Sequence, residues 1–192
     1  MRIPEKAHWE AHFADGNGFR RTDDHELRLL TDHVHPRPGH RALDIGCGLG
    51  GYAAALAGLG YRTLAVDWTE ASAAAVRDRY AGLEPRLTVR CLDFEDAPAV
   101  TEQLPAAGFE LVTTRLVLAF LTDRAAAGER VRDLLAPGGA WVVTTPLAER
   151  LPEERRHIGL PSEDIAALVS AWGQGCWYDL EPGGLRCFVL RP

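Results

Sequence analysis

Between residues 41 and 145, two patterns of hydrophobic positions alternate along the chain. Short apolar runs typical of buried strands are separated by longer segments rich in alanine and leucine, which suit helices that pack on a sheet. The strands are expected at residues 41–45, 62–66, 87–92, 109–113 and 140–145. The helices are expected at residues 51–59, 70–81, 98–104 and 123–135. This β-α alternation at short spacing predicts a parallel sheet covered by helices on both faces.

The chain before this alternation is expected to form two helices. Trp9 and Phe13 are four positions apart, which places them on one face of a helix over residues 5–13. A glycine-containing break at residues 15–18 ends that helix. A second helix is expected over residues 22–34, because Thr and Asp residues at its start can cap it.

The chain after the alternation shows a third pattern. Residues 147–161 are polar, rich in Arg and Glu and bounded by prolines, which indicates an insertion outside the core. A helix is expected over residues 162–172. Two strands, residues 173–180 and 185–191, should then form a hairpin whose turn is residues 181–184.

Length and composition are those of one globular domain, residues 1–192. The chain is 46% hydrophobic and 25% charged, close to the average of folded proteins. No apolar run approaches the ~20 residues of a membrane-spanning helix, and the first residues are polar, so we expect a cytoplasmic protein. The net charge of −6 disfavours nucleic acid as a partner. The preference for arginine over lysine fits a bacterial, GC-rich genome.

A glycine-rich turn follows the first expected strand. Gly46, Gly48 and Gly51 lie between an apolar run and a helix start, which lets a ligand lie against bare backbone at a helix N-terminus. With Asp67 about 20 residues further on, this spacing fits the dinucleotide fingerprint. Asp44 argues against a dinucleotide, because its carboxylate would repel a pyrophosphate but attract a ligand with an amino group and a sulfonium.

The run from Leu43 to Gly50 resembles the first motif of class I S-adenosylmethionine (SAM)-dependent methyltransferases, D/E-x-G-x-G-x-G. The resemblance implies an α/β fold, a three-layer α/β/α sandwich with a seven-stranded, mostly parallel sheet and a C-terminal antiparallel hairpin strand. It implies SAM as cofactor, S-adenosylhomocysteine as its product, and methyl transfer to a small-molecule acceptor by in-line displacement. Residues 1–40 would be a helical lid and residues 147–161 an acceptor-site insertion.

Two further acids end the next two expected strands. Asp67 can accept both ribose hydroxyls, and Trp68 can pack against the adenine; a helix cap and a core aromatic are the structural alternatives. The resemblance implies that Asp93 accepts a hydrogen bond from the adenine amino group. It also implies that the backbone N–H of Phe94 donates to a ring nitrogen of the adenine. Because the carboxyl ends of parallel strands face one crevice, we expect Asp44, Asp67 and Asp93 to bind one ligand.

The fourth expected strand opens into residues 113–121, which resemble the segment beneath the methionine part of SAM in small-molecule methyltransferases. Arg115 either lies at the cofactor or supports this loop. The Asn/Asp-Pro-Pro-aromatic box of nucleobase amino methylation is missing, and Ala119 and Phe120 stand where many relatives carry histidines. The residues expected to bind the cofactor are Asp44, Gly46, Cys47, Gly48, Gly50, Asp67, Trp68, Asp93, Phe94 and Arg115.

The sequence assigns no catalytic residue. A base is needed only if the acceptor must first lose a proton. The candidates are His8, His12, His25 and His157, although a surface or capping role is the simpler interpretation of each. Arg20 and Arg21 can reach the carboxylate of the cofactor. The histidines and acids lack metal-ligand spacing, and the four cysteines form no C-x-x-C pair, so no metal site is expected.

The acceptor side is open to two interpretations. One wall of it can be formed by Arg150, Arg155, Arg156, His157, Trp172 and Trp177, or these residues can form a solvated face. The acceptor atom can be O, N, S or C. Two other functions stay open: a nicotinamide-dinucleotide-binding oxidoreductase, and a SAM-binding protein without catalysis.

Overall fold

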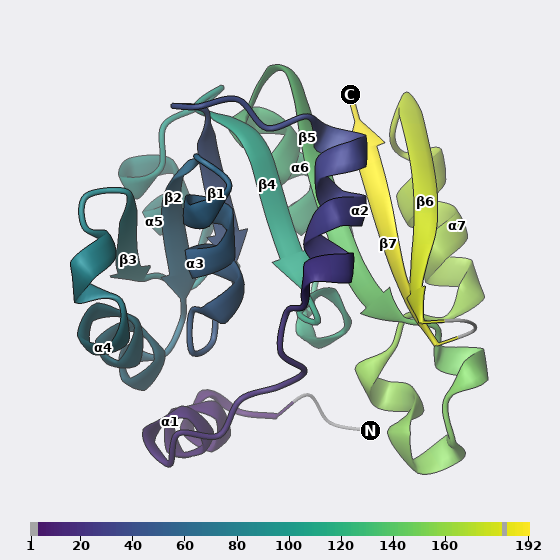
Figure 1. The fold of residues 1–192 in the computed structure, drawn as a ribbon. Coiled ribbons are helices and arrows are strands. Elements are labelled where there is room, and N and C mark those ends of the chain that lie inside the picture. The colour runs from purple at the N-terminus through teal and green to yellow at the C-terminus, as the bar shows by residue number, and fades with distance from the viewer. Residues whose placement is uncertain (1–3, 182–183) are drawn as a thin grey trace.

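The computed structural model describes residues 4–181 and 184–192, and its centre is one seven-stranded sheet (Figure 1). The strand order is β3-β2-β1-β4-β5-β7-β6. The strands are β1 (Arg41–Ile45), β2 (Arg62–Asp67), β3 (Leu87–Cys91), β4 (Phe109–Arg115), β5 (Leu135–Pro146), β6 (Gln174–Glu181) and β7 (Leu185–Arg191). The first five strands pair in parallel, whereas β7 is antiparallel to both β5 and β6. The predicted sheet, with its C-terminal antiparallel hairpin, is confirmed.

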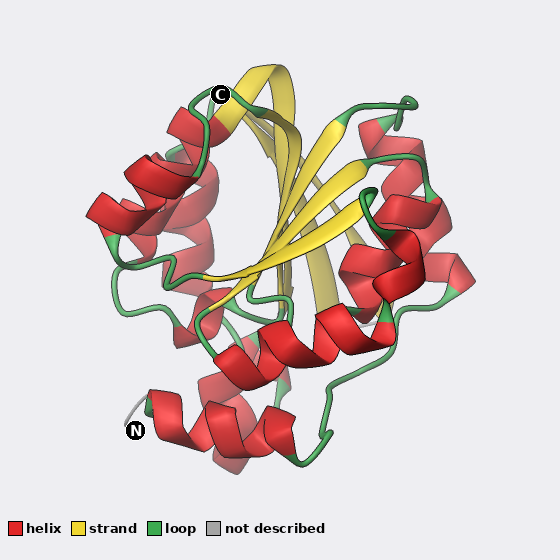
Figure 2. Cartoon of the chain, turned by 90° about the vertical axis from the view of Figure 1, so that its left-hand side faces the viewer, coloured by secondary structure: helices red, strands yellow, loops and turns green. Residues whose placement is uncertain are grey.

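Helices cover both faces of this sheet (Figure 2). The first helical layer is α2 (Asp24–Val34), α3 (Gly51–Gly58) and α4 (Glu70–Arg79). The second is α5 (Ala97–Gln103), α6 (Arg124–Leu134) and α7 (Ser162–Ser170). In β5, Trp141 and Val143 pack in the cluster under the second layer, and Ala140 and Val142 in the cluster under the first. Continuous burial of this strand therefore follows from the three-layer arrangement.

Several element boundaries differ from those expected. Helix α2 begins at Asp24, and the carboxylate of Asp23, not Thr22, accepts the capping hydrogen bond from the Glu26 N–H. Helix α7 ends at Ser170, so Trp172 lies beyond it and is buried in the core. The turn of the predicted hairpin includes residues 182 and 183, which lie outside the described residues, although β6 and β7 pair as expected.

The segment expected to be an insertion is partly built into the core. It contains two short 3₁₀ helices, η3 (Ala148–Arg150) and η4 (Glu153–Ile158). Leu147 and Leu160 form a bridge at its two ends, and both are buried. The polar residues between them are exposed. The prediction of a segment outside the core therefore holds for its middle and is wrong for its ends.

Helix α1 (Lys6–Ala14) belongs to neither helical layer. It lies beyond the carboxyl ends of the parallel strands (Figure 1). The Glu10 carboxylate accepts hydrogen bonds from the backbone N–H groups of Glu70 (3.2 Å) and Ala71 (2.7 Å). Glu10 thus satisfies free donors at the start of α4 and holds α1 across this edge of the sheet. Within the described part of the chain, no helix is long and apolar enough to cross a membrane.

Candidate functional site

A cavity of about 840 Å³ lies at the carboxyl ends of the parallel strands and is bordered by Trp9 and Phe13 of α1. Nine of the ten residues expected to bind the cofactor line it. They are Asp44, Gly46, Cys47, Gly48, Asp67, Trp68, Asp93, Phe94 and Arg115. Because β3, β2 and β1 are neighbours in the sheet, the acids that follow or end these strands open into the same space.

The glycine-rich turn needs its glycines for two different reasons. Gly46 has φ +68°, and a Cβ there would come within 2.5 Å of the Val117 side chain, so the turn passes close under that residue. Gly50 is the N-cap of α3, with φ +78°, and a Cβ there would come within 2.6 Å of Val76 on α4. Gly50 does not line the cavity. It lies instead where the start of α3 packs against α4.

Asp67 is buried at the tip of β2 and fastens the glycine-rich turn to that strand. One carboxylate oxygen accepts from the Gly48 N–H (3.0 Å), and the other from the N–H (3.1 Å) and hydroxyl (2.8 Å) of Thr69. Burial raises the pKa of Asp67, and the hydrogen bonds from Thr69 and Gly48 act against that rise. Thr69, not Asp67, is the N-cap of α4, so the cap alternative for Asp67 is wrong.

Asp44 is the most buried acid of the cavity, with 2% of its surface exposed. The Thr113 hydroxyl donates to its carboxylate at 2.7 Å. Burial raises the pKa of Asp44 to about 7, against the effects of the Thr113 hydrogen bond and the Arg115 charge. A cation beside this carboxyl group would favour its charged form, whereas a pyrophosphate would oppose it.

The other end of the cavity carries Asp93 and two aromatic residues. Asp93 is exposed just beyond β3, and one of its carboxylate oxygens accepts from the Glu95 N–H at 2.9 Å. Phe94 is buried in the main hydrophobic cluster, while Trp68 is half-buried on the cavity lining. This end can therefore offer an acceptor oxygen beside apolar rings, which suits a flat nitrogen-containing base.

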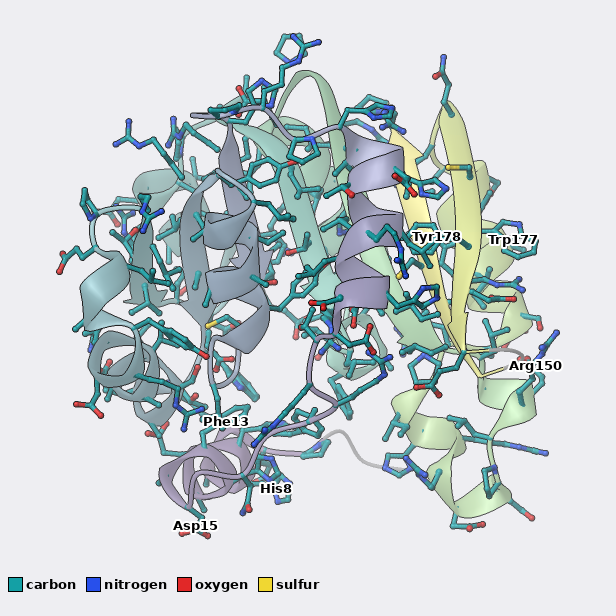
Figure 3. The ribbon with its side chains drawn as sticks, viewed as in Figure 1. His8, Phe13, Asp15, Arg150, Trp177 and Tyr178 are labelled. Atoms are coloured by element: carbon teal, nitrogen blue, oxygen red, sulfur yellow. The ribbon has the colours of Figure 1, made fainter. Side chains whose placement is uncertain are left out.

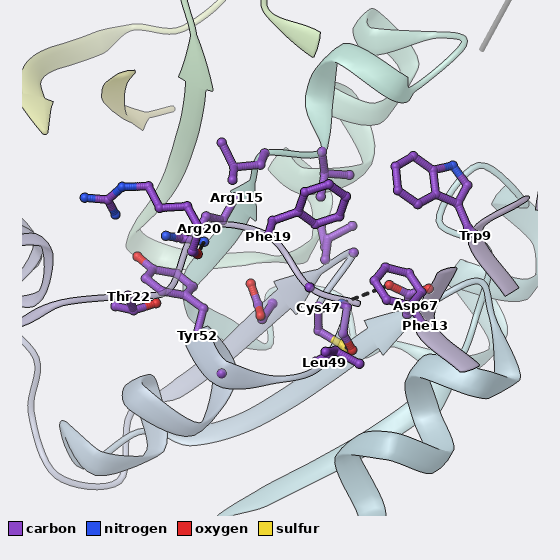
Figure 4. Close-up of a pocket in the computed structure, with 18 of the residues that line it drawn as sticks. Trp9, Phe13, Phe19, Arg20, Thr22, Cys47, Leu49, Tyr52, Asp67 and Arg115 are labelled. Atoms are coloured by element: carbon purple, nitrogen blue, oxygen red, sulfur yellow. Dashed lines mark hydrogen bonds between the residues drawn. The ribbon is translucent and has the colours of Figure 1, made fainter. Parts of the chain in front are cut away.

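Arg115 supports the N-terminal segment through a residue that the sequence analysis missed. Glu26 on α2 is 1% exposed, and its carboxylate accepts from two nitrogens of Arg115, at 2.7 and 3.0 Å. It also accepts from Arg20 at 2.6 Å, and Arg20 in turn pairs with Glu181 at 2.9 Å. Figure 4 shows Arg20 and Arg115 side by side above Tyr52. The available signal was an acid four positions before Leu30, on the apolar face of α2.

The candidate bases do not reach the cavity. None of His8, His12, His25 and His157 is among the residues that line it. His12 stacks behind Phe19 at 5.1 Å, and His25 lies beside Arg28. Among the described residues, no group of three or more His, Cys, Asp or Glu side chains is arranged to hold a metal ion.

The expected acceptor wall does not form as one surface. Trp172 is buried against Trp141, with ring centroids 5.3 Å apart. Trp177 lies exposed on the outer strand β6, beneath the guanidinium of Arg186 (Figure 3). Arg156 and His157 line a separate hollow beside η2 (Leu118–Phe120). The prediction that these arginines and tryptophans share one surface was wrong. The sequence does not show on which face of the sheet the side chains of the C-terminal strands lie.

The cavity fits an adenosyl-sulfonium ligand. The glycine-rich turn lines it together with two buried carboxylates, those of Asp44 and Asp67. A carboxylate can pair with the ammonium group of such a ligand, and a second can accept hydrogen bonds from its ribose hydroxyls. A site for a pyrophosphate would instead need donors or cations where Asp44 stands.

Comparison with known proteins agrees with this chemistry. The family described as "Methyltransferase domain" matches residues 43–143, which run from within β1, through the glycine-rich turn and β2 to β4, into β5. The chain belongs to this family, the class I SAM-dependent methyltransferases, whose cofactor is SAM. The nicotinamide alternative has no support from this match.

The similar proteins include the nocamycin O-methyltransferase of Saccharothrix syringae, 34% identical over 151 residues. That match covers 75% of this chain and 50% of the relative, and the chain spans about half the length of the curated relatives it matches. Among solved structures, phosphoethanolamine N-methyltransferase 2 of Haemonchus contortus with bound SAM has a TM-score of 0.73 at 18% identity, over 94% of this chain and 56% of that one. The [4+2]-cyclase SpnF has a TM-score of 0.72 at 17% identity, over 95% and 91%.

Proposed function

We propose that this protein transfers the methyl group of SAM to a small-molecule acceptor by in-line displacement. The observation that carries the proposal is the convergence of three acids, Asp44, Asp67 and Asp93, from neighbouring strands on one cavity. Of these three acids, Asp93 is exposed, and its carboxylate accepts from the Glu95 N–H. The names of the relatives, several of them small-molecule methyltransferases, support the acceptor class.

Each acid has one proposed contact. Asp44 pairs with the amino group of the cofactor, Asp67 accepts from the ribose hydroxyls, and Asp93 accepts from the adenine amino group, with Trp68 and Phe94 against the ring. Charge-assisted hydrogen bonds of this kind are worth about 1.5–3 kcal/mol each. Together they would hold the adenosyl and amino acid ends of the ligand in one orientation.

Positioning is the main catalytic contribution that we assign to this chain. The bound cofactor supplies an electrophilic methyl carbon with a good leaving group. Holding a nucleophile in line with such a carbon can lower the barrier by up to ~7–11 kcal/mol. Helix α1 and the linker to α2 form the proposed lid, because Glu10 and Glu26 fasten them over the cavity mouth. The exposed middle of residues 147–161 is the proposed outer border of the acceptor site.

A SAM-binding protein without methyl transfer is the second candidate function. It is favoured by the lack of a histidine on the cavity lining, and the same fold occurs in a protein named as a cyclase. Turnover separates the two candidates. Transfer of a labelled methyl group from SAM to any acceptor in a broad panel supports the methyltransferase. Tight binding of SAM without transfer to any of these acceptors supports the second candidate.

Calorimetry tests the cofactor assignment itself. We expect heat of binding with S-adenosylhomocysteine and none with NAD at the same concentration. Heat with NAD alone would contradict the proposal. Asp93→Asn is the informative variant because Asp93 is exposed, so the substitution should leave the fold intact while it weakens binding of the adenine.

A further inference from the structure

The cavity has an aromatic wall built from three separate segments. Trp9 comes from α1, Phe19 from the linker between α1 and α2, and Phe120 from η2. All three line the cavity. The Trp9 ring centroid lies 5.6 Å from that of Phe19 and 5.2 Å from that of Phe120, so the rings touch one another. We call Trp9, Phe19 and Phe120 the aromatic wall.

One face of the Phe19 ring is stacked on a second ring, yet about half of the residue is exposed. His12 stacks on it nearly in parallel, with centroids 5.1 Å apart and an interplanar angle of 22°. Phe19 is nevertheless 52% exposed and lines the cavity. Figure 4 shows it above the middle of the cavity, between Trp9 and Arg20. The open face of an aromatic ring carries partial negative charge and attracts cations within about 6 Å.

The charges around the cavity also favour a cationic ligand. Four arginines line it, but Arg20 and Arg115 are both paired with the buried Glu26. The acids that line it outnumber the arginines: Asp23, Asp24, Asp44, Asp67, Asp93 and Glu95. A cation beside the aromatic wall would therefore gain from both the ring faces and the surrounding potential.

The lining is poor in side chains that readily take a proton near neutral pH. It contains neither a histidine nor a lysine. The phenol of Tyr52 is buried, which raises its pKa well above the ordinary value. Asp44 and Asp67 have cofactor contacts in the proposed function. A nucleophile that already carries a lone pair and has no proton to lose needs no such group.

From these four features we infer that the acceptor is a tertiary amine and that the product is a quaternary ammonium ion held against the aromatic wall. The inference rests on the methyltransferase function proposed above. The nitrogen lone pair forms the new N–C bond to the transferred methyl group, and the C–S bond breaks with its electron pair left on sulfur. The positive charge moves from sulfur to nitrogen, and no proton is released.

Binding of product-like cations tests this inference without turnover. The protein is saturated with S-adenosylhomocysteine and titrated by calorimetry with choline and with 3,3-dimethylbutan-1-ol, a neutral molecule of the same shape with carbon in place of nitrogen. We expect choline to bind about 3- to 30-fold more tightly, the range for a cation over aromatic faces. Phe19→Leu, which keeps an apolar side chain but removes the ring, should abolish most of this preference.

Trp177→Leu is the matched control, because Trp177 is an aromatic residue of similar exposure, 55%, that lies on β6 and does not line the cavity. Its choline preference should equal that of the unmodified protein. Equal binding of choline and its neutral analogue would overturn the inference, as would a preference that survives in both Phe19→Leu and Phe120→Leu. If S-adenosylhomocysteine itself does not bind, the proposed function fails first. If it binds without a choline preference, only the amine assignment fails.

Discussion

At the scale of single residues, the most consequential group is the Asp44 carboxyl, because the fold buries it without an ion pair of its own. Its pKa of about 7 in the folded protein exceeds the value of 3.8 for a free aspartate. The folded state therefore binds a proton between these pH values that the unfolded state has released. Stability from this group is full below about pH 4 and declines as the pH rises through 7, by up to about 1.4 kcal/mol per pH unit.

The first prediction follows from this decline of stability with rising pH. Asp44→Asn can still accept from Thr113 and has no charge to bury, so the ligand-free variant should lose this decline and be more stable than the parent at pH 8. The same variant should bind S-adenosylhomocysteine about tenfold or more weakly, because a charge-assisted contact is lost. Urea unfolding at pH 5 and 8 measures the first effect and calorimetry the second. A parallel pH dependence in both proteins would contradict the account.

The second prediction concerns two adjacent glycines, of which only the first has no room for a side chain. Gly50→Ala forces a side chain into a left-handed conformation and within 2.6 Å of Val76, so we expect a loss of about 2 kcal/mol or more. Gly51→Ala is its matched control. Gly51 is the first residue of α3, and a Cβ there would meet only the Tyr80 hydroxyl at an ordinary 3.8 Å. The control should unfold at the same or a higher temperature. Equal destabilisation by both variants would contradict the structure.

At the scale of elements, one buried carboxylate joins α2 and the linker before it to the tip of β4. Glu26→Gln leaves two guanidiniums without their shared partner, and loss of one member of a buried pair costs about 3–5 kcal/mol. Glu181→Gln removes a partner of Arg20 whose side chain is 57% exposed, so its effect should stay within about 1 kcal/mol. Chemical denaturation of both variants checks the difference. Similar values for the two would show that Glu26 does not organise this junction.

Helix α1 depends on a different contact, the carboxylate of Glu10 at the start of α4. Glu10→Gln should weaken a cap worth about 0.5–2 kcal/mol and speed amide hydrogen exchange in residues 6–14, with little change in the global unfolding transition. Glu129→Gln is the control, since Glu129 lies on α6 and pairs with Arg132 of the same helix. Exchange in α1 that is equally fast in the parent and in Glu10→Gln would exclude this attachment.

At the scale of the whole molecule, the sequence predicted what is encoded locally. The order of strands and helices, the glycine-rich turn and the acids Asp44, Asp67 and Asp93 are all readable from runs of neighbouring residues. Glu26 and the packing of Gly50 on Val76 were missed because both depend on contacts between distant elements. The position of Trp172 was misjudged for the same reason: its burial against Trp141 is decided by where α7 ends.

The central claim is that three strand tips hold three parts of one ligand, and calorimetry with two ligands tests it most directly. S-adenosylhomocysteine is compared with 5′-methylthioadenosine, which lacks the amino acid part, in the parent and in Asp44→Asn, Asp67→Asn and Asp93→Asn. We predict that Asp44→Asn weakens only S-adenosylhomocysteine, by about tenfold or more, whereas the other two variants weaken both ligands. Unchanged affinity in all three variants, or a loss from Asp44→Asn that is equal for both ligands, would contradict the account.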